Sequence, residues 1–392
     1  MSEEKDALLI LPDMDICGGG ERVSYKTGQK LAKRDYNIDI LTNAFDTPEG
    51  EILDKLEDAY GSSEKFRESV QDTHVISDQK IKKFVRSRYK ESLQWRKAEK
   101  LHEENSYDLV VTHYSNIHFM PDFSGAEVVY FLGPGPKLGS AKLRAALKLY
   151  LAPYRLANNL TQRKEEPENY IFISVSEFSK RIFEERFPKI DFRKINPPVD
   201  IESFRYSGEE KENKIINFSR ISPDKANHRF IEAVSELDED TREGWDFRIV
   251  GKLRESERNY YEKLEEKIQK KDLEDTLEIR KNLSFDDLKH ELKTSKLYVH
   301  TAVDDTMPST PIEAMAAGNS ILVHRSGGPW IDVAEEGKFG EGWSETGELA
   351  EKLQVFAQSG DLRPEENIER AKKFSEDKFN REVEELLAEV EN

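Results

Sequence analysis

Short apolar runs alternate with longer amphipathic stretches along most of this chain. Nine runs of four to six residues are rich in Val, Ile, Leu and Phe, which predicts buried β-strands. They cover residues 7–11, 38–42, 109–112, 128–132, 170–175, 215–218, 247–250, 297–300 and 320–323. Between them, stretches with helical spacing of apolar residues predict helices at 21–34, 176–187, 226–237, 256–270 and 284–294.

This alternation is typical of α/β folds in which helices cover both faces of a parallel sheet. Nine strands are too many for one compact sheet in a chain of 392 residues, so we expect two doubly wound domains with a cleft between them. The segment INPPVDIESF at 195–204 is the expected boundary, because its two prolines fit neither a helix interior nor a central strand.

Composition and charge narrow the possible function classes. Hydrophobic residues make up 36% of the chain and aromatic residues 10%, which is enough for packed cores. The net charge of −18 argues against a nucleic-acid-binding protein. The single cysteine, Cys17, excludes an intramolecular disulfide and a cysteine-based zinc cluster, so we expect a reducing compartment.

The first residues and the hydropathy of the chain bear on its location. MSEEKDALLILPDMD carries acids where a secretory signal peptide has basic residues. No run reaches the ~20 apolar residues of a transmembrane helix. We therefore expect a cytoplasmic protein, either soluble or attached peripherally to the inner face of the cell membrane.

Two basic stretches interrupt the acidic background. Residues 128–164 contain no Asp or Glu but include Lys142 and Arg144. Residues 80–100 carry nine Lys or Arg against two Glu, with apolar residues interleaved, and Lys82, Lys83 and Arg86 belong to this stretch. Such a stretch is either a solvated helix face or a surface for anionic headgroups and phosphates, and the sequence leaves both interpretations open.

Ligands of open α/β sheets bind beyond the carboxyl ends of the strands, so the residues that follow each strand are candidates for a site. After the sixth predicted strand, SRISPDK supplies Arg220 and Lys225, two cations suited to a diphosphate. After the ninth, Ser326, Gly327 and Gly328 form a turn whose backbone N–H groups are a second candidate for an anion. Either segment can also be an ordinary surface turn.

The segment DDTMPSTPIEAMAAG has two interpretations. Thr310 as N-cap, followed by proline and by Glu313 three residues after the cap, describes a capping box, with Gly318 ending the helix. That interpretation leaves Asp304 and Asp305 unexplained. Neither these acids nor those of LPDMD have a third acid or a histidine nearby to complete a metal shell, so we expect no metal site.

The segment GGGER follows the first predicted strand and opens a helix, so Gly19 and Gly20 are candidates for cradling phosphate. It is not GxGxxG, which leaves a dinucleotide fold unsupported. His113 closes the third predicted strand and is a candidate for the cleft, although an isolated histidine is more often structural. The sequence has no GxSxG elbow, Walker A loop or HExxH, which removes support for hydrolase, P-loop and zinc-protease functions.

Together these segments resemble the GT-B glycosyltransferases of family 4 over nearly the whole chain. The ordered set is GGGER, VSEFSKRIFEERF, NPPVDIESF, FSRISPDK, FRIVGK, DDTMPSTPIEAMAAG followed by SGGP, and a closing KFSEDKFNREVEELL. The resemblance implies two doubly wound, Rossmann-like domains facing a central cleft. It implies an acceptor-side domain at 1–203, a nucleotide-sugar-binding domain at 204–373, and a C-terminal helix at 374–392 that crosses back onto the first domain.

The resemblance also implies roles for individual residues. Arg220 and Lys225 would grip the diphosphate of a nucleotide-sugar donor, Glu313 would contact the ribose, and Asp305 would lie near the donor sugar. Positive charge there stabilises the departing nucleotide diphosphate, so no metal or other cofactor is required. The implied sets are Asp305, Arg220, Lys225 and His113 for catalysis; Gly19, Gly20, Arg220, Lys225, Asp305, Thr306, Met307 and Glu313 for the donor; Ser326, Gly327 and Gly328 for its phosphates or sugar; and Lys82, Lys83, Arg86, Lys142 and Arg144 for the acceptor or membrane.

Two positions depart from the family pattern. Asp305 stands where the family has Glu, which sets its carboxylate back by about 1.5 Å. Leu132 stands where the family usually has a histidine that bonds the donor sugar. His113 could partly substitute for that histidine.

The segment YFLGPGPKLGSAKLRAALKLY is similar to the branch that includes dolichol-linked oligosaccharide and bacterial polysaccharide mannosyltransferases. The implied function is a retaining, metal-independent hexosyltransferase that uses a nucleotide-diphosphate sugar, with GDP-mannose favoured. Its acceptor would be a glycan or a polyprenyl-phosphate-linked glycan at the cytoplasmic membrane face. The alternatives are a catalytically silent GT-B scaffold, motivated by Leu132 and Asp305, and a UDP-sugar epimerase in third place.

Overall fold

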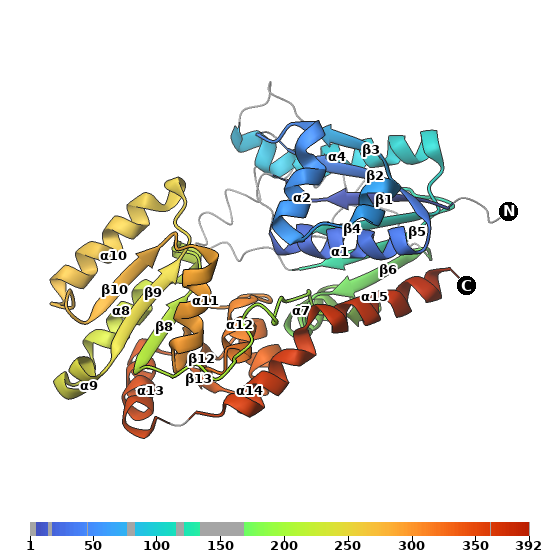
Figure 1. The fold of residues 1–392 in the computed structure, drawn as a ribbon. Coiled ribbons are helices and arrows are strands. Elements are labelled where there is room, and N and C mark those ends of the chain that lie inside the picture. The colour runs from blue at the N-terminus through green and yellow to red at the C-terminus, as the bar shows by residue number, and fades with distance from the viewer. Residues whose placement is uncertain are drawn as a thin grey trace. The chain divides into compact units, whose positions relative to one another are not determined.

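The computed structural model describes residues 5–14, 18–44, 46–76, 83–114, 121–133, 168–360 and 362–391, with the side chains of 83–92 and 114 excepted. The chain folds into two compact units. The first comprises Met1–Val175, Ser179–Pro197 and Asn380–Asn392, and the second comprises Ser176–Phe178 and Pro198–Phe379. Each unit is built on one parallel sheet with helices on both faces, which confirms the predicted α/β class (Figure 1).

The first unit contains a seven-stranded sheet in the order β3-β2-β1-β4-β5-β6-β7, and all its strand pairs in the described residues are parallel. Its strands are β1 (Lys5–Leu11), β2 (Tyr36–Asn43), β3 (Val70–Ile76), β4 (Leu109–Tyr114), β5 (Glu127–Leu132), β6 (Tyr170–Ser174) and β7 (Phe192–Lys194). Its helices are α1 (Gly19–Lys33), α2 (Ile52–Tyr60), α3 (Glu64–Ser69), α4 (Lys83–Asn105), and most of α7 (Glu177–Arg186) and α15 (Glu376–Val390).

Alternate residues of the central strands face opposite layers of helices in this unit. Leu8 belongs to the core that includes Trp95 of α4, whereas Leu9 faces α1. A Cβ atom on Gly28 of α1 would lie 2.9 Å from a Leu9 methyl group, so glycine lets the helix approach closely. The end of α15 lies along α1, where Glu384 pairs with Lys30 at 2.8 Å (Figure 1). This pairing assigns the last turns of the chain to the first unit.

The second unit contains a six-stranded parallel sheet in the order β10-β9-β8-β11-β12-β13. Its strands are β8 (Lys214–Phe218), β9 (Asp246–Gly251), β10 (Leu277–Lys281), β11 (Leu297–His300), β12 (Ser320–His324) and β13 (Glu341–Trp343). Its helices are α8 (His228–Ser235), α9 (Glu239–Gly244), α10 (Arg258–Lys270), α11 (Phe285–Thr294), α12 (Thr310–Ala316), α13 (Thr346–Ser359) and α14 (Pro364–Ala371).

Two cores sandwich this second sheet. Ile215, Phe247 and Val299 pack with residues of α8, α10 and α13 on one face. Their neighbours Ile216 and Tyr298 pack with residues of α11, α12 and α14 on the other face. The apolar runs are nearly continuous because both faces of these strands are buried.

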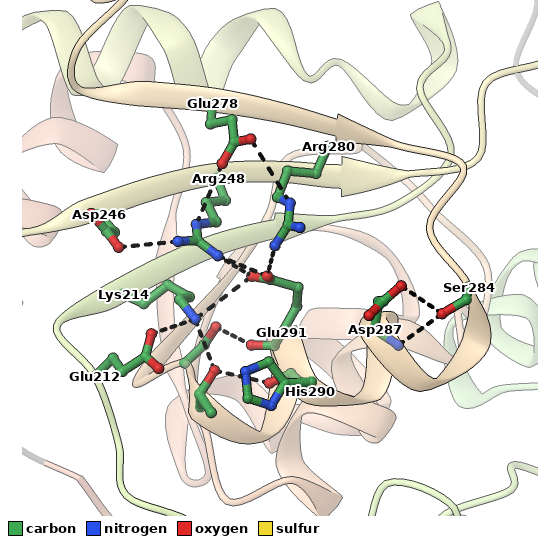
Figure 2. Close-up of polar contacts among 12 residues, drawn as sticks. Glu212, Lys214, Asp246, Arg248, Glu278, Arg280, Ser284, Asp287, His290 and Glu291 are labelled. Carbon is green, nitrogen blue, oxygen red and sulfur yellow. Dashed lines mark hydrogen bonds and ion pairs between the residues drawn. The ribbon is translucent and has the colours of Figure 1, made fainter.

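A buried charge cluster joins α11 to three strands (Figure 2). The carboxylate of Glu291 is 1% exposed and lies 2.7 Å from Arg248 and 3.7 Å from Lys214, which is equally buried. It also pairs with Arg280. These cations come from β9, β8 and β10, so one carboxylate connects the helix to half of the sheet.

All nine predicted strands are present, and the five predicted helices are confirmed with shifts of a few residues at their ends. Four strands, β3, β7, β10 and β13, were not predicted from the sequence. These are the outermost strands of the two sheets, and their exposed sides carry polar residues that break the apolar run. In the described ranges, no helix is both long and apolar enough to cross a bilayer.

Candidate functional site

The strand order of the second unit indicates where a ligand would bind. The chain adds β9 and β10 on one side of β8, and then β11, β12 and β13 on the other. The loop that leaves β8 therefore leads toward β9, whereas the loop that leaves the neighbouring β11 leads the opposite way, toward β12. Open α/β sheets bind ligands at this point, beyond the carboxyl ends of the strands.

Lys225 and Asp305 meet at this point. Lys225 ends a short 3-10 turn after β8, and its carbonyl oxygen accepts a 2.7 Å hydrogen bond from the Thr301 hydroxyl, which follows β11. Its ammonium group forms an ion pair with Asp305 Oδ2. Their side chains are only 16% and 19% exposed, so this pair is largely shielded from solvent.

Asp305 is held in its charged form by its surroundings. Its Oδ1 accepts a 3.0 Å hydrogen bond from the Thr306 N–H, and its Oδ2 lies 3.5 Å from His300 Nε2. Burial raises the pKa of Asp305, but the proximity of His300 and the charge of Lys225 outweigh this and lower the pKa well below its usual range. Asp305 is therefore an acceptor and an anion at neutral pH.

His300 extends this arrangement into the protein interior. The imidazole is 2% exposed, and its Nδ1 lies 2.9 Å from the Tyr298 hydroxyl, which is 2.8 Å from the Thr310 hydroxyl. Burial lowers the pKa of His300, so the ring is neutral near pH 7. His300 was not predicted as a site residue, although it closes a predicted strand as His113 does.

The Gly-Gly turn packs against the Asp305 loop. A Cβ atom on Gly328 would lie 1.9 Å from the carbonyl oxygen of Thr306, and Gly327 has a φ of +75°, so glycine is required at both positions. The N–H of Gly328 donates to the carbonyl oxygen of Asp305 at 2.8 Å. The prediction that this N–H is open to an anion is therefore wrong, because it holds the loop. Ser326 accepts a 2.8 Å hydrogen bond from the backbone N–H of Asp304.

Arg220 lies at the exposed rim of the same edge. Its guanidinium is 43% exposed and pairs with Asp224 at 3.1 Å, and it makes no ion pair with any other described residue. The loop beneath it depends on Gly251 at the end of β9, where a Cβ atom would lie 1.7 Å from the carbonyl oxygen of Ser219. Gly251 was part of the FRIVGK motif but was not selected as a site residue.

Glu313 lies in the first turn of α12, although the predicted capping box is wrong. The helix begins at Thr310, so that residue is inside it, and Ser309 before it makes no side-chain cap. The Thr310 hydroxyl bonds to Tyr298 instead of a backbone N–H. Gly318, with a φ of +78°, follows the helix end as expected. Met307 packs partly against the core on this face.

In the first unit the strand order changes direction between β1 and β4, and Gly20 and His113 meet at this equivalent point. A Cβ atom on Gly20 would lie 2.7 Å from His113 Nδ1. Burial lowers the pKa of His113 to about 4, so this ring is neutral. Glu21, which was not predicted as a site residue, accepts 2.9 Å hydrogen bonds from the N–H groups of Asp13 and Gly18. Its buried carboxylate thus holds the loop before α1, and burial raises its pKa.

The other predicted residues divide into two groups. Leu132 ends β5 and is fully buried, so it offers no polar group to a ligand. Lys82, Lys142 and Arg144 lie outside the described residues, as does the whole segment 134–167. Lys83 and Arg86 lie in α4, where the structure describes only the backbone at these positions.

Comparisons with known proteins agree with this architecture. Residues 199–374 match the family described as Glycosyl transferases group 1. A relative from Xenopus laevis, named GDP-Man:Man(3)GlcNAc(2)-PP-Dol alpha-1,2-mannosyltransferase, is 27% identical over 190 residues, covering 44% of this chain and 37% of its own length. The chain thus spans less than two fifths of the curated relatives it matches.

Solved structures share the fold over almost the whole chain. A glycosyltransferase from Rickettsia africae superposes with a TM-score of 0.68, at 15% identity over 99% of both chains. The Anabaena protein HepE, crystallised with UDP and glucose, superposes with a TM-score of 0.65, at 17% identity over 98% of this chain and 100% of its own. The match at 199–374 assigns that segment to the glycosyl transferases of group 1, and the whole chain shares the GT-B fold of the solved structures.

Proposed function

We propose that this protein is a retaining, metal-independent hexosyltransferase that uses a nucleotide-diphosphate sugar, with GDP-mannose as the favoured donor. The acceptor is a glycan or a polyprenyl-phosphate-linked glycan at the cytoplasmic face of the membrane. The bond between the sugar C1 and the diphosphate oxygen breaks, an acceptor hydroxyl oxygen bonds to C1, and the hydroxyl proton is released.

The observation that carries this proposal is the pair of cations on the loop after β8, at the carboxyl edge of the second sheet. Lys225 is partly shielded and Arg220 is exposed at the rim. A departing nucleotide diphosphate gains negative charge in the transition state, and fixed cations stabilise that charge more than they stabilise the bound donor. Glu313, in the first turn of the nearby α12, is proposed to bind the ribose hydroxyls.

Mannose and a lipid-linked acceptor are supported by the relatives. The names of the matched proteins specify GDP-mannose as donor and a dolichol-diphosphate oligosaccharide as acceptor. The neighbour HepE was crystallised with UDP and glucose, so the fold admits other donors. The basic residues Lys82, Lys83, Arg86, Lys142 and Arg144 are proposed to face the acceptor phosphate or an anionic membrane.

A catalytically silent GT-B scaffold is the second candidate. Leu132 is apolar and buried where the family usually has a histidine, and Asp305 is engaged with Lys225. A silent scaffold would bind a nucleotide or a glycan but would not break the donor. The two candidates therefore differ in whether donor is consumed.

The test is a thermal-shift screen with GDP, UDP, ADP and their common sugars, followed by an assay for nucleotide release from the donor that binds. We expect one nucleotide-sugar to raise the melting temperature of the wild type but not of Glu313→Ala, and to be hydrolysed slowly without acceptor. Binding without any hydrolysis or transfer would favour the scaffold. A folded protein that responds to no nucleotide would refute the transferase and favour a scaffold that binds a glycan.

A further inference from the structure

The cation assigned to the donor diphosphate is already neutralised by the protein itself. Lys225 pairs with Asp305 Oδ2, and neither side chain is more than 19% exposed. A diphosphate that binds Lys225 must therefore compete with Asp305. If it succeeds, the Asp305 carboxylate loses its cationic partner in a largely buried environment, and an unpaired buried charge is costly.

His300 can serve as a second partner for the Asp305 carboxylate. His300 Nε2 lies 3.5 Å from the same oxygen, Oδ2, which is too far for a well-formed hydrogen bond. Within the described residues this buried nitrogen has no hydrogen-bond partner at all. The other ring nitrogen is fixed by the Tyr298 hydroxyl at 2.9 Å, so the ring is already oriented with Nε2 toward Asp305.

We propose that Asp305 is a built-in anion that holds Lys225 until a nucleotide diphosphate replaces it, and that His300 then takes up a proton and becomes the partner of the Asp305 carboxylate. This inference rests on the proposed function, because it needs the diphosphate to bind Lys225. His300 acts through Asp305 and is a positioning residue.

The charges balance in both states. Without ligand, Lys225 is cationic, Asp305 is anionic and His300 is neutral. With ligand, the diphosphate neutralises Lys225, and a proton from solvent on His300 neutralises Asp305. Donor binding therefore consumes one proton, and affinity should increase as the pH falls from 8 toward 6.5.

The groups that face His300 support this exchange. Burial lowers the pKa of His300, the nearby Asp305 carboxylate raises it, and the charge of Lys225 lowers it. Tyr298, on the same strand, stays neutral because burial raises its pKa. From β12, His324 is also neutral, because burial lowers its pKa. When diphosphate neutralises Lys225, its repulsion disappears, and the attraction of Asp305 is opposed only by the effect of burial.

The experiment is calorimetric titration of GDP and UDP at pH 7.5 in buffers of different ionisation enthalpy, which counts the protons taken up on binding. The full chain is used as wild type, His300→Gln and Asp305→Asn. His290→Gln is the matched control, because His290 is exposed and lies on α11, which contributes no residue to the candidate site. We expect uptake approaching one proton in the wild type and the control.

We expect little or no proton uptake in His300→Gln. Asp305→Asn should also lose the uptake, and should bind GDP about fivefold more tightly because its Lys225 no longer has a competing anion. Uptake that persists in His300→Gln would locate the proton elsewhere and overturn the assignment. Nucleotide binding without proton uptake in the wild type, or with no gain in Asp305→Asn, would overturn the exchange but leave the proposed function intact. Absence of nucleotide binding would refute the proposed function and the inference together.

Discussion

Removing the charge of Glu291 should destabilise the second unit strongly. Glu291→Gln keeps the shape of the side chain but leaves Lys214, Arg248 and Arg280 without their shared carboxylate. Lys214 is 1% exposed and would retain only Glu212 as an ion-pair partner in the described residues, at 2.6 Å. Breaking a buried ion pair by removing one partner costs about 3–5 kcal/mol, because the remaining charge stays buried.

The appropriate assay is hydrogen exchange of the β8, β9 and β10 amides, read peptide by peptide. A chain with two compact units need not unfold in one step, so a single melting curve would average over both. We expect exchange through global opening of this unit to be at least a hundredfold faster in Glu291→Gln, which corresponds to about 3 kcal/mol.

Glu266→Gln is the matched control for this experiment. Glu266 pairs with Lys270 on α10 at 3.5 Å, but both side chains are mostly exposed. Exposed pairs contribute at most about 1 kcal/mol, so exchange should hardly change. A loss of less than about 1 kcal/mol in Glu291→Gln, similar to the control, would refute the claim that the buried cluster stabilises this sheet.

Three further predictions follow from the packing and charge of individual residues. Gly251→Ala should weaken GDP binding and destabilise the second unit, because the added Cβ would meet the backbone before Arg220. Gly244→Ala is the control, since Gly244 has open space around it. Calorimetry and thermal melts should show no change in its GDP affinity or melting temperature. The pKa of His113 is about 4 in the folded state and about 6.5 when unfolded, so protonation favours the unfolded chain. The free energy of unfolding should therefore be highest above pH 6.5 and should fall by at most about 3 kcal/mol toward pH 4. Urea melts should show a shallower pH dependence in His113→Gln, and equal slopes would contradict this. Asp332→Asn should speed amide exchange at the start of α7, because the Asp332 carboxylate accepts hydrogen bonds from the Glu177 and Phe178 N–H groups at 2.6 and 3.1 Å; unchanged exchange there would contradict the capping role.

The central strands were predictable because burial on both faces forces continuous apolar runs. Edge strands such as β10, LEIRK, were not, since their polar residues face partners that only the folded chain brings together. Arg280 of β10 is paired with Glu291, which is eleven residues later in the sequence and on a helix. A linear pattern contains no signal for that pairing.

The candidate site was predictable where a short motif fixed the position of a residue at a strand end. Lys225 and Asp305 were selected separately, but nothing in their spacing of eighty residues indicates that they form an ion pair. His300 was missed because its role depends on the orientation of its ring between Tyr298 and Asp305. The capping interpretation of Thr310 failed because a tertiary partner, Tyr298, takes the hydroxyl.

The proposed function requires a nucleotide-diphosphate sugar to bind at the cationic edge of the second sheet. The most direct test is calorimetric titration of GDP-mannose into the wild type and Arg220→Ala, with Glu266→Gln as a surface control. Loss of a charge-assisted hydrogen bond to phosphate should weaken binding by tenfold to a hundredfold, roughly 1.5–3 kcal/mol, in Arg220→Ala only. Equal affinity in all three proteins, or no binding to the folded wild type, would contradict the account.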